Sequence, residues 1–439
     1  MCTVDGCRIY DDLSCKRCLF LGDRKVFWLR YECYVEGIHS GNHPDGDHGV
    51  CGGIHLIKNI IMVKNILIAP NAFKNSLNAV DAAAAIAKGF LQSKLNCTCT
   101  CFPVGDGGDG TANLIIEKFK GKRVAVKVSD PLGREISTSF GLIDNGKTAV
   151  IEMADASGIR LLNSTELDPL KANTHGTGEM IKLALDEGVD HLIIGMGGSA
   201  TVDGGTGILQ ALGMRFLDVN ENDLINLPES LPQLYTIDLS KIDRRIFACT
   251  ITILCDVDNY LLGPLGSAKV FGPQKGATPE GVKQLQASLL NFRDIVLKDT
   301  GKDIGLTKYG GAAGGAAAGL HAFLNAILVP GATYFLELTG FEESLQNADI
   351  VLTGEGSIDE QTLQGKAPFA VAQMAKKYGL PVIGLAGKIP QETDGQLAHY
   401  FDMLLAITNG PADLNTAMKN TGADLTRVAT QIGNLLASF

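Results

Sequence analysis

The sequence lacks most features of nucleic-acid-binding, membrane and secreted proteins. Its 439 residues have a net charge of −10, one tryptophan and no run of basic residues, which argues against nucleic-acid binding and a polybasic membrane patch. The apolar stretch at 54–69 is interrupted by Lys58 and Lys64, so it is not apolar enough to span a bilayer. No basic segment precedes a clean apolar run, as it would in a secretory signal. We therefore expect a cytoplasmic protein without nucleic-acid or membrane partners.

Glycine, in contrast, is abundant, with 52 residues, well above the ~7% of an average protein. The chain is dense in glycine at "VGDGGDGT" (104–111), "IGMGGSATVDGGTG" (194–207) and "CDVDNYLLGPLGSAKVFGPQKGA" (255–277). Glycines allow a loop to turn its N–H groups toward an anion, but they also form tight turns where elements pack closely. The glycines alone leave both interpretations open.

Residues 1–61 differ from the rest of the chain. They hold more than half of the 11 cysteines, the only tryptophan, and no helical or strand period. Cys15 and Cys18 with His39 and His43 suggest a zinc module, although the gap between the pairs is longer than in a C2H2 finger. We favour the alternative that this segment is a poorly ordered or non-native extension and that the protein starts at Met62. The remaining cysteines are interpreted as reduced packing residues.

The chain after residue 62 alternates strand-like and helix-like segments. Such alternation predicts a parallel sheet covered by helices, and a chain of this length is expected to form two or three domains. Strands are predicted at 65–70, 122–130, 136–143, 148–153, 191–197, 251–256, 349–354, 381–387 and 402–407, and helices at 79–95, 178–188, 279–298, from 367 and from 412. Ligands of such sheets bind beyond the carboxyl ends of the strands. We therefore expect one or two clefts lined by strand-end loops.

Two nucleotide-binding motifs need to be considered. The glycines and alanine at 195–200 follow a strand as in a dinucleotide-binding fingerprint, and Asp218 is suitably spaced for a ribose contact. However, the glycines at 204–207 would lie in the first turns of the required helix, each at a cost of roughly 1 kcal/mol relative to alanine. The segments 272–278 and 363–368 do not have the spacing of a Walker A motif. A nicotinamide-dependent dehydrogenase is therefore the weaker alternative, and a P-loop enzyme is excluded.

Carboxylates in the loops favour phosphoryl transfer of another class. Magnesium prefers oxygen ligands, usually one or two carboxylates together with the phosphates of a substrate. Acidic residues lie in or beside the glycine-containing and strand-end loops at Asp106, Asp109, Asp203, Asp256, Asp258, Glu355 and Asp359. Lys74 and Lys275 are the lysines that their loops place best to neutralise phosphate charge. A module that binds an anion or solute without chemistry is the alternative outside the enzymes.

Several longer motifs are similar to those of a known family. They occur in the order "IAPNAFKNSL", "GDGGDGT", "VIEMADASG", "THGTGE", "GMGGSATVDGG", "CDVDN", "VFGPQKGATPE", "GAAGG" and "LTGEGSIDEQTLQGKAP". With these motifs the chain resembles the bacterial two-domain glycerate kinases from about Met62 to its end. Residues 1–61 lie outside the resemblance.

The resemblance implies an ATP-dependent enzyme that phosphorylates D-glycerate to 2-phospho-D-glycerate. It implies an α/β fold of two domains: one with a flavodoxin-like parallel sheet, one mixed α/β domain, and an interdomain cleft that closes over the substrates. Together with the strand pattern, it predicts a discontinuous flavodoxin-like domain at 62–103 plus 330–439. The second domain, at 104–329, would carry the glycine-rich loops. ATP and Mg²⁺ are the expected cofactors, and a homodimer is compatible with the sequence.

Roles for individual residues follow as hypotheses. Asp203 is predicted to be the base that takes the proton of the glycerate hydroxyl. Lys74 and Lys275 are predicted to neutralise the transferred phosphoryl group. The predicted magnesium ligands are Asp256, Glu355 and Asp359. The predicted substrate- and phosphate-binding residues are Ser76, Asp106, Gly197, Gly198, Ser199, Thr201, Gly204, Gly205 and Gln274.

The chain departs from the usual family pattern at three of the motif positions. Asn71 stands where the family commonly has an aspartate, and Asp109 stands where it more often has a glutamate. Ser357 replaces an arginine that often follows the Gly-Glu-Gly motif. If that arginine binds the substrate carboxylate in relatives, another cation must do so here.

Overall fold

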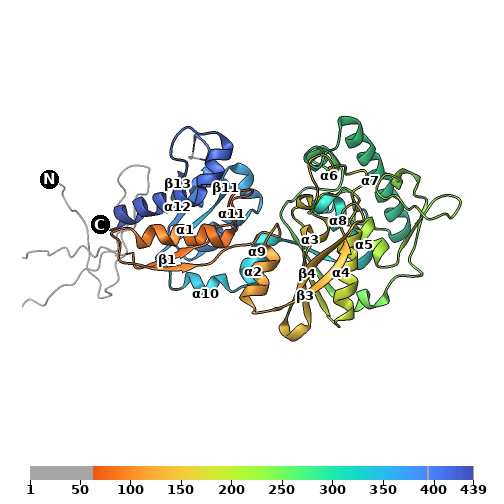
Figure 1. Cartoon of the computed structure of the whole chain (residues 1–439), viewed down its shortest axis with the longest axis horizontal. Helices are drawn as coiled ribbons and strands as arrows, with labels where there is room; N and C mark the ends of the chain where they lie inside the picture. The colour runs from red at the N-terminus through yellow and green to blue at the C-terminus, as the bar shows by residue number, and fades with distance from the viewer. Residues whose placement is uncertain (1–62, 393–394, 439) are drawn as a thin grey trace, which may run out of the picture.

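The computed structural model describes residues 63–392 and 395–438, which form two large sheets flanked by helices and one two-stranded sheet (Figure 1). The expectations for residues 1–61, the zinc module and the early start among them, lie outside the described residues. Within the described ranges, no helix is both long and apolar enough to cross a membrane.

The first sheet, called the parallel sheet below, has five strands that all run in the same direction. Its strands are β1 (Asn65–Ile68), β2 (Thr98–Cys101), β11 (Ile350–Ser357), β12 (Val382–Lys388) and β13 (Met403–Ala406). The spatial order β2-β1-β11-β12-β13 corresponds to 2-1-3-4-5, which is the order of flavodoxin-like sheets. The predicted flavodoxin-like sheet is therefore confirmed.

Helices cover both faces of the parallel sheet because its strands are apolar on both sides. Ile66 and Ile68 face α1 (Ala79–Leu91) and α12 (Leu414–Leu436), while Leu67 and Ala69 face the opposite side. That side is covered by α9 (Gly331–Leu338), α10 (Phe341–Leu345) and α11 (Ala367–Lys377). Asn78 caps α1 by accepting a hydrogen bond from the backbone N–H of Asp81.

The second sheet, called the mixed sheet, has six strands in the order β10-β9-β6-β5-β4-β3. β3 (Lys122–Ser129) and β4 (Glu135–Ile143) form an antiparallel hairpin, and β4 also runs antiparallel to its other neighbour, β5. The remaining strands are mutually parallel: β5 (Thr148–Glu152), β6 (His191–Gly195), β9 (Thr250–Cys255) and β10 (Ile327–Pro330). The predicted mixed α/β unit is therefore confirmed as well.

The helices of the mixed sheet lie on its two faces. One face packs on a core with α3 (Ala154–Ser157), α4 (His175–Asp186), α5 (Thr206–Ala211), α6 (Ser267–Phe271), α7 (Pro279–Thr300) and α8 (Ala316–Leu324). The other face packs on α2 (Thr111–Lys118) and α9. These two helices share one buried apolar cluster with the parallel sheet, in which Ile193 and Leu254 of the mixed sheet join Leu67 and Val351. Because the two sheets share this cluster, the division of the chain into two domains stays a prediction.

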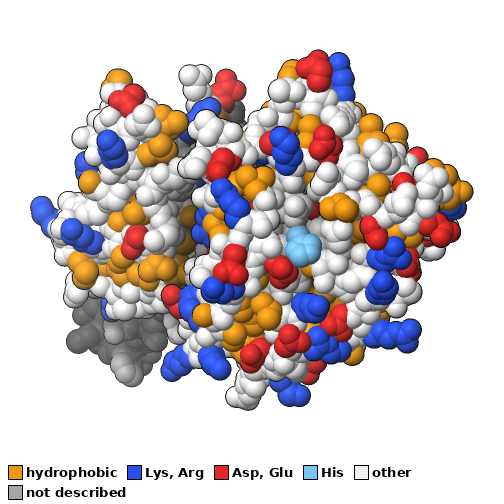
Figure 2. All heavy atoms as spheres, turned by 45° about the vertical axis from the view of Figure 1, so that its right-hand side comes forward, with side chains coloured by type: hydrophobic (Ala, Val, Ile, Leu, Met, Phe, Trp, Pro, Cys, Tyr) orange, Lys and Arg blue, Asp and Glu red, His pale blue; other side chains and the backbone are white. Residues whose placement is uncertain are grey.

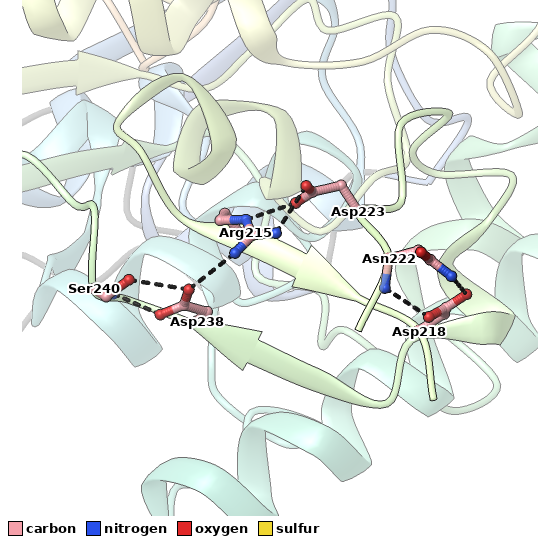
Figure 3. A network of polar contacts seen from close by, with 6 residues as sticks. All are labelled: Arg215, Asp218, Asn222, Asp223, Asp238 and Ser240. Atoms are coloured by element: carbon pink, nitrogen blue, oxygen red, sulfur yellow. Dashed lines mark hydrogen bonds and ion pairs between the residues drawn. The ribbon is translucent and has the colours of Figure 1, made fainter. Parts of the chain in front are cut away.

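A short antiparallel pair, β7 (Arg215–Leu217) and β8 (Thr236–Asp238), extends from the mixed-sheet half. Figure 3 shows Arg215 between two carboxylates, with Asp223 accepting from Nε and Nη2 at 2.9 Å each and Asp238 accepting from Nη1 at 3.5 Å. Asp218 accepts bonds from the backbone N–H and the side-chain amide of Asn222. Phe216 and Ile237 of this pair are buried in the apolar core of the mixed-sheet half, so the polar contacts add to apolar packing.

Candidate active site

Polar side chains gather at the carboxyl ends of β1, β2 and β11. Asn71 and Lys74 follow β1, Asp106 follows β2, and Glu355 lies in the last part of β11. In flavodoxin-like sheets the chain order reverses between the first and third strands, here β1 and β11, and ligands bind at that point. Figure 2 shows a furrow between the parallel-sheet half and the mixed-sheet half, with charges of both signs along it.

Lys74 is the cation at the centre of this group. The carboxylate of Asp106 raises the pKa of Lys74, partial burial opposes that rise, and Asp256 and Glu355 raise it further. Asp256 follows β9 of the mixed sheet, so carboxylates from both sheets act electrostatically on one ammonium group. The structure thus brings Lys74 near Asp106, Asp256 and Glu355, while its role at a phosphoryl group stays a prediction.

Glu355 is 8% exposed, and burial raises its pKa to about 7 despite the nearby ammonium group of Lys366. Its Oε1 accepts a hydrogen bond from Thr362 Oγ1 at 3.3 Å and lies 3.6 Å from Lys366 Nζ. The backbone N–H of Asp359 donates to the same Thr362 hydroxyl at 3.0 Å. Two predicted magnesium ligands, Glu355 and Asp359, therefore belong to one hydrogen-bonded turn.

Asp256 lies outside that turn, in the segment that follows β9 of the mixed sheet. Burial raises its pKa, Lys74 opposes the rise, and the negative charge of Asp106 adds to it. Its Oδ2 would lie 3.1 Å from a Cβ built on Gly197, so the carboxylate borders the glycine-rich loop that follows β6. Among the residues that the structure describes, no three His, Cys, Asp or Glu side chains are grouped so as to hold a metal ion. The predicted trio of Asp256, Glu355 and Asp359 therefore does not form a complete metal site.

The loop at 105–110 touches both sheets, and this explains its glycines. A Cβ on Gly107 (φ +91°) would lie 2.6 Å from the carbonyl oxygen of Leu254 at the end of β9. The Gly107 carbonyl accepts a hydrogen bond from Gly197 N at 2.9 Å. Asp106 accepts from Asn71 Nδ2 at 2.8 Å. Glycines here permit close backbone packing between the two halves of the molecule.

The glycine-rich loop after β6 is held from behind by Lys275. This lysine is 4% exposed, and its Nζ donates to Ser199 Oγ at 2.9 Å and to the Thr201 carbonyl at 2.7 Å. Burial lowers its pKa to about 8, against the opposing effect of Asp203 and Asp256. The predicted contact of Lys275 with a transferred phosphoryl group is not supported by this geometry, because its ammonium group is already surrounded by the loop.

Asp203 is fully buried beneath the same loop. Its Oδ2 accepts from Thr174 N (2.9 Å), Thr174 Oγ1 (2.7 Å) and Gly207 N (3.2 Å), and its Oδ1 accepts from Gly205 N (3.0 Å). Burial raises the pKa of this carboxyl group in spite of these donors. A base must come within hydrogen-bond reach of the substrate hydroxyl. The geometry of Asp203 instead favours support of the loop and of the start of α5.

The remaining predicted residues divide between the site and the core. Gly197, Gly198, Ser199 and Thr201 line the loop beside the carboxylates, whereas Gly204 and Gly205 pack on side chains or backbone of α7 and α8. Ser76 Oγ donates to the Met418 carbonyl at 2.5 Å and to Thr421 Oγ1 at 2.7 Å, which ties it to α12. Gln274 is exposed beside Lys275. Ser76, Gly204 and Gly205 therefore have structural contacts in place of the predicted phosphate contacts.

Comparison with known proteins identifies the family to which a chain with these loops belongs. A family model described as the glycerate kinase family matches residues 66–437. The chain belongs to the glycerate kinase family. A glycerate kinase from Halalkalibacterium halodurans is 43% identical over 84% of this chain and 97% of its own length. A glycerate 2-kinase from Escherichia coli is 39% identical over 85% of this chain and 98% of its own length. The predicted family is thus confirmed, and with it the class of kinases that use ATP.

A solved structure agrees with this placement. A crystal structure of a Salmonella typhimurium LT2 protein, provisionally assigned as glycerate kinase 2, has a TM-score of 0.72 and 40% identity. The similarity covers 86% of this chain and 99% of that one. The alternative of a dehydrogenase is wrong for this family, and Asp218 instead closes the turn after β7 (Figure 3).

Two buried residues of the site were missed by sequence reasoning. Thr174 holds Asp203, and Glu152 at the end of β5 accepts hydrogen bonds from the start of α2. The only sequence signal for Glu152 is an acidic residue at the end of an apolar strand, in "VIEMADASG". A lone carboxylate of this kind is rarely buried without a partner.

Proposed function

We propose that this chain transfers the γ-phosphoryl group of ATP to the 2-hydroxyl of D-glycerate, giving ADP and 2-phospho-D-glycerate. The observation that carries the proposal is the meeting of Lys74 with Asp106, Asp256 and Glu355 where the carboxyl ends of the two sheets converge. Phosphoryl transfer needs positive charge on the phosphates, oxygen ligands for magnesium and a proton acceptor. The four side chains supply these chemical types within one site.

In the proposed reaction the glycerate hydroxyl oxygen forms a bond to the γ-phosphorus while the bond from that phosphorus to the bridging oxygen of ADP breaks. Lys74 neutralises charge on the transferred group, because it is the exposed lysine among the carboxylates. Asp256 accepts the hydroxyl proton, since its pKa is raised and it borders the glycine-rich loop. Asp203 and Lys275 support that loop from below and do not themselves contact the substrates.

The donor set also fits magnesium held by few protein ligands. Mg²⁺ commonly binds one or two carboxylates and completes its shell with substrate phosphates and water. Glu355 and Asp359 would hold it, because both are hard oxygen donors of the turn fixed by Thr362. When bound, the ion supplies additional positive charge on the phosphate oxygens. Asp106, Asp256 and Glu355 outnumber the ammonium groups of Lys74 and Lys366 beside them, and this excess of carboxylates favours such a cation.

The backbone N–H groups of Gly198 and Ser199 and the Ser199 hydroxyl would hold the carboxylate of glycerate, while the Gly197 N–H already donates to Gly107. A glycine-rich segment can present several N–H groups to one anion. Gly198 has φ +73°, a conformation that favours glycine, and it places the loop against Asp109. No arginine is required in this arrangement, which accommodates Ser357.

The test is ADP release with ATP and Mg²⁺, with D-glycerate, with L-glycerate and with no acceptor. Phosphorus NMR of the product distinguishes 2-phosphoglycerate from 3-phosphoglycerate. We expect ADP release that depends on D-glycerate, and loss of about 10²-fold or more of kcat in Lys74→Met because charge neutralisation is lost. Lys88→Met, an exposed lysine of α1, is the matched control and should keep the activity of the unmodified protein. Saturable glycerate binding without any ADP release would instead support the solute-binding alternative.

A further inference from the structure

Glu152, the last residue of β5, carries a buried carboxylate that the reaction proposed above does not use. It is 3% exposed, and it accepts hydrogen bonds from Gly110 N at 2.6 Å through Oε1 and from Ala112 N at 3.3 Å through Oε2. These N–H groups belong to the first turn of α2, whose N-cap residue is Gly110 with φ +90° and no capping side chain. Glu152 therefore supplies from a different strand the acceptor that a cap residue normally supplies. Its negative charge also lies at the positive end of the helix.

The loop that ends at Gly110 is the loop that joins the two halves of the site. Asp106 accepts a hydrogen bond from Asn71 at 2.8 Å and is the main cause of the raised pKa of Lys74. Two residues further on, Gly108 Cα would lie 2.4 Å from a Cβ on Gly197 in the glycine-rich loop. The chain enters this loop from the parallel sheet and leaves it into α2, where Glu152 of the mixed sheet holds it.

We propose that Glu152 is a positioning residue for phosphoryl transfer. It fixes the loop at 105–110 against the mixed sheet, and so sets how far Asp106 and its neighbour Lys74 lie from the glycine-rich loop. This inference rests on the function proposed above, because it concerns the alignment of the groups that act on the two substrates. Small displacements of such groups have large effects, and misplacement by about 1 Å can cost ~10²-fold in rate.

Burying the Glu152 carboxylate has an electrostatic cost. Burial raises the pKa of Glu152 to about 7, Asp155 and Asp109 raise it further, and the Gly110 N–H and Arg160 lower it. The ionised carboxylate is therefore less favourable in the folded protein than in the unfolded chain above neutral pH. A glutamine has the same size and no charge, so it removes this cost. Its Oε1 can still accept from Gly110, but its NH₂ group would face the N–H of Ala112, donor against donor.

Glu152→Gln separates positioning from structural support. We measure kcat, KM for ATP, KM for D-glycerate and the urea unfolding midpoint at about pH 8, above the raised pKa. We expect kcat to fall about tenfold or more with little change in either KM. The unfolding midpoint should be equal to that of the unmodified protein or higher, because a buried charge has been removed. The control is Glu166→Gln in the same half, whose Oε2 accepts from Asn163 N at 2.9 Å, and it should keep kcat.

Two results would overturn the proposal. One is an unchanged kcat in Glu152→Gln, and the other is a fall in kcat that accompanies an equivalent fall in the unfolding midpoint, as a purely structural residue would give. If the unmodified protein itself shows no glycerate-dependent ADP release, the proposed function fails instead, and the two failures are thus distinguishable.

Discussion

The raised pKa of Glu355 predicts how the stability of the protein depends on pH. Burial raises this pKa from 4.5 to about 7, so the folded protein binds a proton more tightly at Glu355 than the unfolded chain does. Stability from this group is complete below the unfolded pKa and is lost as pH rises through the folded pKa. Because Glu355 is 8% exposed, solvent screening reduces the effect little.

The magnitude follows from the two pKa values. At ~1.4 kcal/mol per pKa unit, the full loss is about 3 kcal/mol, of which about 2 kcal/mol falls between about pH 5.5 and about pH 8. Glutamine at this position mimics the protonated carboxyl group and can still accept from Thr362 Oγ1. Glu355→Gln should therefore lose about 2 kcal/mol less stability than the unmodified protein over this interval.

The assay is urea unfolding of both proteins at the two pH values, in EDTA so that no divalent ion alters the charge of the carboxylate. Other groups that titrate in this range, Glu152 among them, change equally in both proteins and cancel in the comparison. Glu135→Gln is the matched control, since Glu135 pairs with Lys127 on the surface with a side chain 68% exposed. Parallel pH dependence in the unmodified protein and Glu355→Gln would refute the reasoning.

Three further predictions concern the glycine-rich loop and its neighbours. Because burial lowers the pKa of Lys275 to about 8, the unmodified protein should gain about 3 kcal/mol of stability between about pH 8 and about pH 10.5. Lys275→Met should not show this gain, and a urea midpoint with the same pH profile in both proteins would contradict the prediction. Asp203→Asn should lower the unfolding midpoint, since its amide would face backbone donors, while the folded variant keeps more than about a tenth of kcat; a stable variant with ~10²–10⁴-fold lower kcat would restore Asp203 as the base. Gly107→Ala should destabilise the protein more than Gly110→Ala in thermal unfolding. Both positions have a positive φ, so alanine is strained by roughly 1 kcal/mol at either one, but only at Gly107 would the new methyl group clash with the backbone. Equal effects of the two substitutions would argue against that clash.

Much of the fold could be predicted because it depends on local patterns. Apolar runs of strand length and the alternation with helices predicted most strands of both sheets to within a few residues, but not β10. Errors occurred at helix ends, where the helix predicted at 79–95 ends at Leu91 and the one predicted from 178 begins at His175. The helices α2 and α9 were not predicted, since the first begins inside a glycine-rich loop and the second follows directly after β10. Both helices matter, because they join the cores of the two sheets.

The sequence by itself determined the α/β class, the family and the set of loops that form the site, because apolar periodicity and long motifs are properties of neighbouring residues. Only the tertiary structure decided which side chains of those loops face the furrow. Lys275 meets Ser199 across 76 residues of chain, and Glu152 meets Gly110 across 42. Such contacts set burial, and burial decides whether a charged group can reach a substrate or must support a loop. For that reason Lys74 lies near the carboxylates of the site, while Lys275 and Asp203, equally prominent in the sequence, lie buried beneath the loop.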